Sequence, residues 1–532
     1  MTRRRSAGAV AAAWQLAFGE LAAAAIPCAR SPIDGLGKRL IDATPGPVAD
    51  IVIATVESHD KALLRATIVG GSVATGALAA SNRRRGIGAL SALGAATAVA
   101  AASCKDAAPV PTLAAGAAGT LAGPATLAAL GPQPSRRRIA AAAGLAGLVA
   151  LAALALDRAR LRSLDAARAA SPVPASPPPD RGLPIPGISP LYTPAGSFYV
   201  TDVTARPPRL DANEWRLRVG GMVDRTLELT LDDLTSLGLV ELDATLVCVH
   251  NPVGGDRIGT ARWLGVPIAT LLERAGVQPG AEQLLARSVD GFTAGVPVER
   301  IRSGAPALLA IGMNGEPLPF DHGFPARLLV PGLWGADANT KWLTELELTT
   351  WGAVSDYWDR RGWPRQPSRV QPAARIDVPA GRAVVAPGAV TVAGVAWAPP
   401  LGVEGVEVQV DDGPWQPADL GTEVAPTMWR QWSWTWAATT GEHVLRARTI
   451  GRDRTQPAGA EPPYPVGVRG YHERRVSVVE GGSGSRRLAA LVDDARERLV
   501  LAGRGATAWR DRGFPPTPSF PAPLPGRPPH RG

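Results

Sequence analysis

Apolar residues gather in five long blocks in the first third of the chain, and charged residues are almost absent from them. The blocks cover residues 8–27, 63–80, 86–102, 110–130 and 139–156. Each is close to the ~20 residues with which an α-helix crosses the hydrocarbon core of a bilayer. The alternative is a soluble Ala-rich bundle, which should carry charged stripes at helical spacing, and the blocks show almost none. We therefore predict an all-α transmembrane bundle of about five helices, a membrane anchor over residues 1–157.

Basic residues between the blocks predict the orientation of this anchor. Runs of three arginines occupy positions 3–5, 83–85 and 136–138, whereas the alternate loops mix both signs of charge. Because basic loops stay in the cytoplasm, we expect a multi-pass protein of the cell membrane, with its N-terminus inside and everything after residue 156 outside. The arginines at 158, 160 and 162 run against this assignment. The third run also resembles a twin-arginine export signal, and plain retention of positive charge inside explains it equally well.

A few polar residues within the anchor leave alternatives open. Glu20 lies inside the first block, where an ionisable group is costly; it either marks a proton or ligand path or faces Gln15 or another helix. Cys28 and Cys104 fall at predicted outer helix ends, where they form either a disulfide or two free buried thiols. No histidine lies in any block, and His59 only precedes the second, so no haem is predicted in the bundle.

The periodicity of apolar positions changes after the anchor. Pro-rich residues 158–188 predict an extended linker. Residues 189–365 mix strand-like and short helical runs, which predicts an α+β domain. Period-two runs separated by Gly, Asp and Pro turns over 370–480 predict an immunoglobulin-like β-sandwich, in which we expect Trp434 to occupy the core. Residues 481–532 are predicted to be a flexible Pro-rich tail that includes one short amphipathic helix.

Composition excludes some classes of function. The formal net charge is +9, from 56 basic and 47 acidic residues, which alone suggests nucleic acid or an anionic membrane surface as a partner. Because the arginine runs lie between apolar blocks, we assign them to membrane topology and predict no nucleic-acid partner. The three cysteines show no CxxC or Cys/His spacing, so a structural zinc site is not predicted.

The segment LVCVHNPVGGDRIGTARWLGVPI, residues 246–268, is the richest in candidate chemistry. Cys248 follows an apolar strand-like run and precedes a loop with Asn251 and two glycines. A thiolate at a strand end beside backbone donors suits a soft metal. A Cys-His hydrolase with His250 as base is a second interpretation, although no local signature of such enzymes is present. The third is an inert cysteine buried in the strand.

A second segment, residues 314–348, places His322, Arg327 and Lys341 among glycine and proline turns. Three cationic or donor groups on tight loops suit an anionic, phosphate-bearing ligand. Glycines at positions 323, 332 and 335 would let the backbone approach that ligand closely. A basic loop without a ligand is the ordinary alternative.

Taken together, and in this order, the two segments resemble the molybdenum-cysteine and pterin-binding segments of the sulfite oxidase family. Residues 370–480 resemble the dimerisation domain of that family, and the likeness covers about residues 189–479. The resemblance implies a molybdenum-molybdopterin cofactor with Cys248 as the metal ligand. It also implies that the cofactor contacts these residues: Tyr199, Asn251, His322, Arg327 and Lys341.

The sequence departs from the family near the expected substrate site. Sulfite-oxidising members usually carry an arginine soon after the ligand cysteine, where this chain has Val249, His250 and Pro252. Phe292 and Thr293 stand where an active-site tyrosine is sought. The cofactor could therefore be kept while the substrate differs.

The resemblance implies oxygen-atom transfer on a small anionic or sulfur-containing substrate, oriented by His250 or Arg257 beside Cys248. The electron-transfer partner is not identified, and a homodimer is consistent with the sandwich domain. Two alternatives remain. One is a cofactor-free, membrane-anchored binding or assembly protein on a degenerate fold. The other is a reductase of oxidised sulfur groups fed from the quinone pool.

Overall fold

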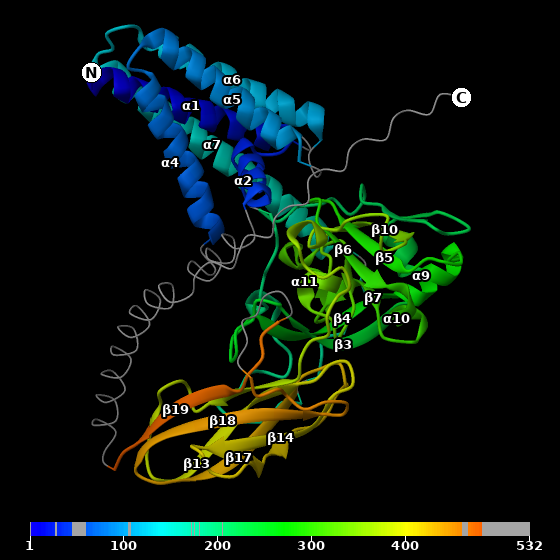
Figure 1. Ribbon diagram of the computed structural model, residues 1–532. Coiled ribbons are helices and arrows are strands. Elements are labelled where there is room, and N and C mark those ends of the chain that lie inside the picture. The colour runs from blue at the N-terminus through cyan, green and yellow to red at the C-terminus, as the bar shows by residue number, and fades with distance from the viewer. Residues whose placement is uncertain are drawn as a thin grey trace.

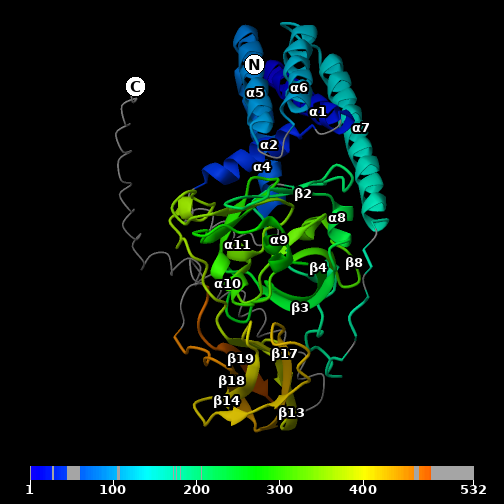
Figure 2. The same ribbon diagram turned by 90° about the vertical axis from the view of Figure 1, so that its right-hand side faces the viewer.

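The computed structural model describes residues 2–26, 29–44, 60–104, 108–171, 173–174, 176–179, 181–204, 206–459 and 467–480. Three bodies follow one another along the molecule: a helical bundle, a mixed α/β body and a β-sheet body (Figures 1 and 2). Cys28, His59 and the predicted tail 481–532 lie outside the described residues.

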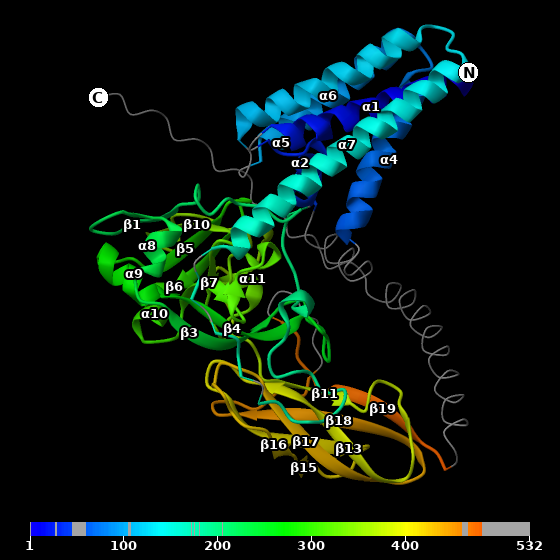
Figure 3. The same cartoon turned by 180° about the vertical axis from the view of Figure 1, so that it is seen from behind.

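The helical bundle contains all five predicted apolar blocks as helices. They are α1 (Thr2–Ala25), α4 (Asp60–Ala79), α5 (Arg83–Ala102), α6 (Pro109–Leu130) and α7 (Arg136–Ala169). All five are long and apolar enough to cross a membrane, by length and composition. A shorter helix, α2 (Pro32–Ala43), occupies a segment that we expected to be a loop. Helix α7 continues well past residue 157, through the first part of the predicted linker, and reaches the mixed body (Figure 3).

Small residues explain how closely these helices pack. Helix α1 contacts α4, α6 and α7. A Cβ placed on Gly8 would lie 2.1 Å from the carbonyl oxygen of Gly76, and one on Gly119 would lie 2.7 Å from that of Gln15. The backbones therefore touch where the side chains are missing, which is how helices associate in lipid. Cys104 is a free, buried thiol that donates to the carbonyl of Ala100 at 3.4 Å.

The mixed body confirms the predicted combination of sheets and helices. One sheet has the order β2-β1-β10-β5-β6, with β1 and β10 parallel, and the other has the order β3-β4-β7-β8, with β9 paired to β7. The strands are β1 (Leu217–Gly221), β2 (Leu227–Leu229), β3 (Val240–Val247), β4 (Ile258–Pro267), β5 (Gln283–Ser288), β6 (Thr293–Pro297), β7 (Leu308–Met313), β8 (Glu316–Pro317), β9 (Arg327–Leu329) and β10 (Leu343–Thr349). Helices α8 (Leu231–Thr235), α9 (Ile268–Ala275), α10 (Val298–Arg302) and α11 (Gly335–Ala338) accompany them.

The last body has two sheets that share one apolar core. The first, β11-β13-β17-β16, has the bounds Ala373–Val378, Gly388–Trp397, Arg430–Ala438 and Asp419–Leu420. The second, β12-β19-β18-β14-β15, has the bounds Val384–Val385, His472–Val478, Gly441–Gly451, Val403–Val410 and Gln416–Pro417. Trp432 and Trp436 are buried in the shared core, whereas Trp434 is only partly buried against it. Trp434 thus packs against the core as expected, but the best-buried indoles are its neighbours two residues away on the same strand face.

Candidate cofactor and active site

Cys248 lies directly after β3, at the start of the loop that joins β3 to β4. Its backbone N–H donates to the carbonyl of Arg257 at 3.0 Å, which continues the antiparallel pairing of the two strands. The side chain of Asn251 closes the same loop, because its Oδ1 accepts from the backbone N–H of Arg257 at 2.8 Å. The Asn251 N–H in turn donates to the carbonyl of Cys248 at 3.0 Å. The loop thus holds the thiol on a hydrogen-bonded frame.

The β-sheet body supports this loop from the other side. Arg375, on β11, donates to the carbonyl of Gly255 at 2.7 Å. Gly254 has φ +73°, and a Cβ at that position would lie 2.2 Å from the ring of His472, on β19. His472 accepts from the backbone N–H of Ile376 through Nδ1 at 2.9 Å. Because Gly254 has no side chain, the loop can lie directly against this ring.

The thiol of Cys248 is almost fully buried, with 4% of the residue exposed. Burial raises its pKa, but the hydrogen bonds and electrostatic interaction with His250 outweigh that effect and lower the pKa below its ordinary value. The hydroxyl of Thr201 also donates to Sγ at 3.8 Å. This environment favours a thiolate, the form in which cysteine binds metals.

The second predicted segment brings its three residues together. The short helix η3 (Phe320–His322) ends at Gly323, whose φ of +107° is costly for any other residue. A Cβ on Gly323 would lie 3.0 Å from Cβ of Lys341 and 3.2 Å from Cβ of Arg327. His322, Arg327 and Lys341 therefore surround one tight turn, as the sequence predicts. Gly332 does not belong to this group, since a Cβ there would lie 2.6 Å from Pro400.

His322 is a buried, neutral imidazole. Burial, together with the nearby charges of Arg327 and Lys341, lowers its pKa to about 4. Its Nε2 lies 3.0 Å from the carbonyl oxygen of Ala195, so in the neutral ring Nε2 carries the proton and donates. His322 therefore positions the segment that leads to Tyr199, and it does so without adding a cation to the site.

Arg327 is a buried cation without a carboxylate partner among the described residues. Its guanidinium donates to the carbonyls of His322 at 3.1 Å and Asn339 at 3.4 Å, and it lies 5.0 Å from the ring centre of Trp263. Burial lowers its pKa to about 10, which still leaves it charged at neutral pH. A buried, unpaired charge costs several kcal/mol, so this position suits an anionic ligand.

Three donors at and beside Arg327 have no hydrogen-bond partner in the part of the chain that the structure describes. They are Nε of Arg327 itself, Nδ2 of Asn339 and Oγ1 of Thr340. Leu328 on β9 donates to the carbonyl of Thr340, which brings these groups side by side. Buried polar groups in native proteins are normally satisfied, so a cluster of unsatisfied donors points to a bound acceptor.

Lys341 is largely buried, with 10% of its side chain exposed, and it is partnered. Its Nζ donates to Oδ2 of Asp202 at 3.2 Å and to the carbonyl of Asp321 at 2.9 Å. Asp202 also pairs with Lys61 of helix α4. Burial would raise the pKa of Asp202, but the two lysines outweigh burial and lower it.

Tyr199 lies between the two predicted segments. Its ring stacks on Phe198, with 5.4 Å between ring centres. A Cβ on Gly335 would lie 3.0 Å from the Tyr199 hydroxyl and 3.3 Å from the carbonyl of Val247, at the end of β3. Burial raises the pKa of this hydroxyl; Cys248 raises it further, and the charge of Arg327 opposes both. The hydroxyl is thus within electrostatic range of both the thiol and the buried guanidinium.

The loop after β3 carries both residues predicted to orient a substrate. His250 is two residues after Cys248, and its ring centre lies 6.2 Å from that of Trp363. Arg257 ends the loop; its carbonyl pairs with Cys248, and its side chain is partly exposed. Both residues therefore belong to the loop that holds the thiol, and Arg257 is joined to Cys248 through its backbone.

Sequence reasoning missed four residues of this site: Thr201, Asp202, Asn339 and Thr340. The first pair lies two and three residues after Tyr199, and the second directly precedes Lys341. Each was therefore within three residues of one that had been identified. Their roles depend on partners that are distant in the sequence, 47 residues away for Thr201 and about 140 for Asp202, or on an unsatisfied donor. A local pattern records neither.

The donor set fits a metal that arrives with ligands of its own. The described residues contain no group of three or more His, Cys, Asp or Glu side chains that could hold a metal ion. They do provide the buried thiol of Cys248, whose pKa is lowered. They also provide a separate set of donors for an anion, on Arg327, Asn339 and Thr340. A single protein sulfur plus an anion site suits a metal carried by a phosphate-bearing organic group.

Comparisons with known proteins agree with this geometry. A family model described as the oxidoreductase molybdopterin binding domain matches residues 204–358. Mitochondrial sulfite oxidase of Mus musculus is 33% identical over 269 residues, which cover 43% of this chain and 49% of that protein. Sulfite oxidase of Gallus gallus is 34% identical over 275 residues, covering 44% and 60%. The uncharacterized oxidoreductase YuiH of Bacillus subtilis is 30% identical over 167 residues, covering 31% and 81%. The chain spans about half the length of the mouse protein.

Proposed function

Because the chain belongs to the sulfite oxidase family of molybdopterin-dependent oxidoreductases, we propose that it is a membrane-anchored molybdenum enzyme that performs oxygen-atom transfer on a small anionic or sulfur-containing substrate. One observation carries the proposal. A buried thiol lies on a hydrogen-bonded loop, and the same body holds a buried guanidinium that has no carboxylate partner among the described residues and lies beside further unsatisfied donors.

Each part of the proposed cofactor would have its own residues. The Cys248 thiolate would bind molybdenum, and Arg327, Asn339 and Thr340 would bind the phosphate end of the pterin with their unsatisfied donors. When bound, the cofactor would supply a metal that exchanges an oxygen atom and two electrons with the substrate. Asn251, which closes the Cys248 loop, would position the metal ligand.

The substrate would be oriented from the loop that holds the thiol. His250 and Arg257 lie at two points of this loop, and both carry donors that suit the oxygens of an anion. We expect His250→Ala and Arg257→Ala together to raise KM at least 10-fold in the fraction of the protein that contains molybdenum. Unchanged KM and kcat in the double variant would remove these residues from the proposal.

Anchoring in the membrane is supported by the surface of the helices. Most of the strongly exposed large apolar side chains in the described structure belong to the bundle, among them Leu78, Val110, Leu121, Leu148 and Leu151. An aqueous surface rarely carries so many. We propose that lipid covers them, with the N-terminus in the cytoplasm and the redox module outside.

The two-sheet body is proposed to be immunoglobulin-like, a shape consistent with a homodimer.

Metal and pterin analysis of the purified, detergent-solubilised full chain tests the proposal against its rival. The proposed enzyme should contain molybdenum and yield the fluorescent oxidation product of a pterin in matching amounts. A cofactor-free binding or assembly protein should contain neither after expression in a host that makes the cofactor. A comparison of electron donors and acceptors in the same preparation would separate oxidation of the substrate from reduction.

A further inference from the structure

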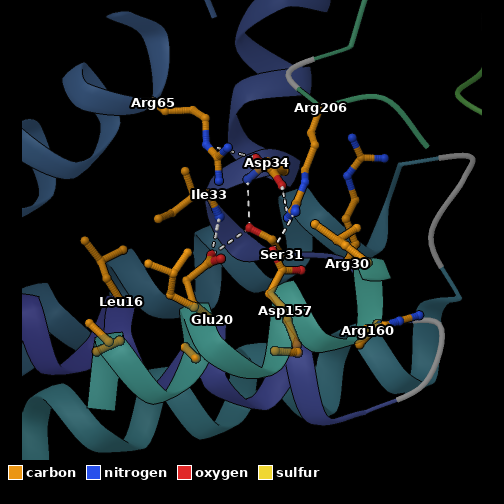
Figure 4. Close-up of a pocket in the computed structure, with 18 of the residues that line it drawn as sticks. Leu16, Glu20, Arg30, Ser31, Ile33, Asp34, Arg65, Asp157, Arg160 and Arg206 are labelled. Carbon is orange, nitrogen blue, oxygen red and sulfur yellow. Dashed lines mark hydrogen bonds and ion pairs between the residues drawn. The ribbon is translucent and has the colours of Figure 1, made fainter. Parts of the chain in front are cut away.

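A cavity of about 1270 Å³ lies where the helical bundle meets the mixed body. Its walls come from α1, α2, α4 and α7, and its floor comes from the segment around residues 206–211 (Figure 4). This volume exceeds the roughly 300–1,000 Å³ of ordinary ligand pockets, so it can take a long ligand. The cofactor residues described above do not line it.

The cavity is apolar along the helices and polar where α2 begins. Side chains from membrane-type helices form the apolar wall, including Val10, Leu16, Val69 and Leu154. The polar end holds Glu20, Ser31, Asp34 and Asp157 with several arginines. A ligand that fills such a space must be amphiphilic, with a long apolar tail and a compact polar head.

Glu20 is fixed at the junction between the two ends. Its Oε1 accepts from the Ser31 hydroxyl at 2.6 Å and from the Ile33 N–H at 3.3 Å (Figure 4). Ser31 also caps α2, since its Oγ accepts from the N–H of Asp34 at 3.1 Å. Among the described residues, no hydrogen bond reaches the second oxygen, Oε2, of this cavity-lining carboxyl. Glu20 therefore has a hydrogen-bonding atom to offer to a ligand head.

The charges around the polar end are balanced. Five arginines and five carboxylates line the cavity. Arg65 pairs with Asp34 at 3.3 Å, and Arg206 pairs with Asp157 at 2.5 Å. Arg209 pairs with carboxylates at 3.7 and 3.8 Å. Three of the five lining arginines are thus already paired, and the lining holds as many carboxylates as arginines. The balance of charge therefore favours an uncharged, hydrogen-bonding head over a phosphate.

The floor of the cavity adjoins the cofactor segment. The guanidinium of Arg209 lies 4.6 Å from the ring centre of Phe320, and it pairs with Asp321 at 3.8 Å. These two residues belong to η3, which ends in His322. A ligand in the cavity would thus be separated from the cofactor segment by little more than one side-chain layer.

We propose that this cavity binds a quinone, with its ring at the polar end and its isoprenoid tail along the apolar wall. A quinone ring is uncharged and carries oxygens that bond to donors and, once reduced, hydroxyls that bond to carboxylates. Oε2 of Glu20 is the atom that would meet it. A role for this quinone in electron transfer rests on the proposed function, because a lipid-soluble electron carrier is useful only beside a redox centre. Binding of the quinone does not depend on the proposed function.

The test measures binding of a decyl-tailed benzoquinone to the full-length protein in detergent, by quenching of tryptophan fluorescence, with molybdenum content recorded for every sample. Leu16→Trp fills the cavity, and Leu121→Trp places the same bulk on a lipid-facing position of α6 that does not line it. We expect Kd to rise at least 10-fold in Leu16→Trp and to be unchanged in Leu121→Trp. Glu20→Leu, which preserves helix and apolarity, should weaken binding of the reduced form, the decyl-tailed hydroquinone, at least 10-fold, because only the hydroxyls of the reduced form can donate to Oε2.

Equal affinity in wild type and Leu16→Trp would overturn the proposal. So would extraction of a phospholipid in place of a quinone from purified wild type, if Leu16→Trp removes that phospholipid. The samples also separate this inference from the proposed function. Loss of quinone binding with molybdenum retained would refute only the cavity, and quinone binding without molybdenum would refute only the enzyme.

Discussion

Lys61, in the first turn of helix α4, forms an ion pair with Asp202 of the mixed body, and the same carboxylate binds Lys341 at 3.2 Å. The side chain of Asp202 is only 2% exposed. One buried carboxylate therefore joins the helical bundle to the segment that holds His322 and Arg327. Through this contact, the proposed anchor supports the proposed cofactor site.

Removing the Asp202 charge should lower the stability of the protein and weaken its retention of the cofactor. In Asp202→Asn, Lys341 remains buried beside Lys61 without a countercharge, and breaking a buried pair in this way costs about 3–5 kcal/mol. We expect a lower Tm and loss of most of the pterin from the purified protein. Asp412→Asn, on a fully exposed carboxylate, should leave both unchanged. Equal Tm and pterin content in the two variants would show that the pair is incidental.

Arg327→Met should separate stability from cofactor retention. Because Arg327 has no carboxylate partner among the described residues, an apolar residue of similar length should leave the Tm of the cofactor-free protein unchanged or raised. The same change should reduce bound pterin at least 10-fold. Arg262→Met provides the contrast, since Arg262 binds Asp243 at 2.9 Å and its loss should lower Tm. If Arg327→Met retains pterin, the phosphate site is elsewhere.

Gly254→Ala tests the support of the Cys248 loop. The new Cβ would meet the His472 ring at 2.2 Å and would also sit at φ +73°. Gly238→Ala is the matched control, because its φ is +83° and nothing lies within 4 Å of the new Cβ. Both variants should lose about 1 kcal/mol to backbone strain, and Gly254→Ala about 1–3 kcal/mol more to the clash. We expect only Gly254→Ala to lose molybdenum, and equal losses in the two would contradict the role of the contact.

Stability should fall on acidification because of His472. Burial lowers its pKa to about 3, and the charges of Arg474 and Arg375 act in the same direction. The unfolded chain, with an ordinary histidine pKa near 6.5, binds a proton first, so this contribution to stability is lost as the pH falls from about 6.5 toward 3. Chemical denaturation at stepped pH should show a shallower acid loss in His472→Asn.

His443 supplies a control of opposite sign for the pH experiment. Its hydrogen bond to Asp411, at 2.8 Å, raises its pKa. Its stabilising contribution is therefore complete below the ordinary histidine pKa and is lost as the pH rises through the raised value. His443→Asn should flatten the profile on the alkaline side of pH 6.5 and leave the acid side unchanged. Identical profiles for the two variants would exclude both assignments.

The sequence predicts this fold well where the residues of a single segment are enough to identify its secondary structure. The five apolar blocks are long and carry very few charged residues, so each could be recognised from its own residues alone. Helix α2 was missed because it is short and mixes charges with apolar residues, although Ser31 before Pro32 and Asp34 is a cap signal that could have revealed it. The length of α7 was underestimated because arginines after residue 157 were assigned to a linker.

The candidate site was predictable only in part, because only some of its residues stand in a local motif. Cys248, His322, Arg327 and Lys341 stand in motifs, whereas Asp202 acquires its role from Lys61 and Lys341, each about 140 residues away. The support of Gly254 by His472 likewise joins two separate bodies. Long-range pairs of this kind have no local period or spacing, so only the folded chain reveals them.

X-ray absorption at the molybdenum edge tests the central claim most directly. We predict that purified wild type contains molybdenum with a sulfur neighbour from the protein, and that Cys248→Ser either loses the metal or shows one sulfur neighbour fewer. Cys104→Ser, which changes another buried free thiol, should match wild type. An unchanged sulfur count in Cys248→Ser with full molybdenum content, or no molybdenum in wild type, would contradict the account.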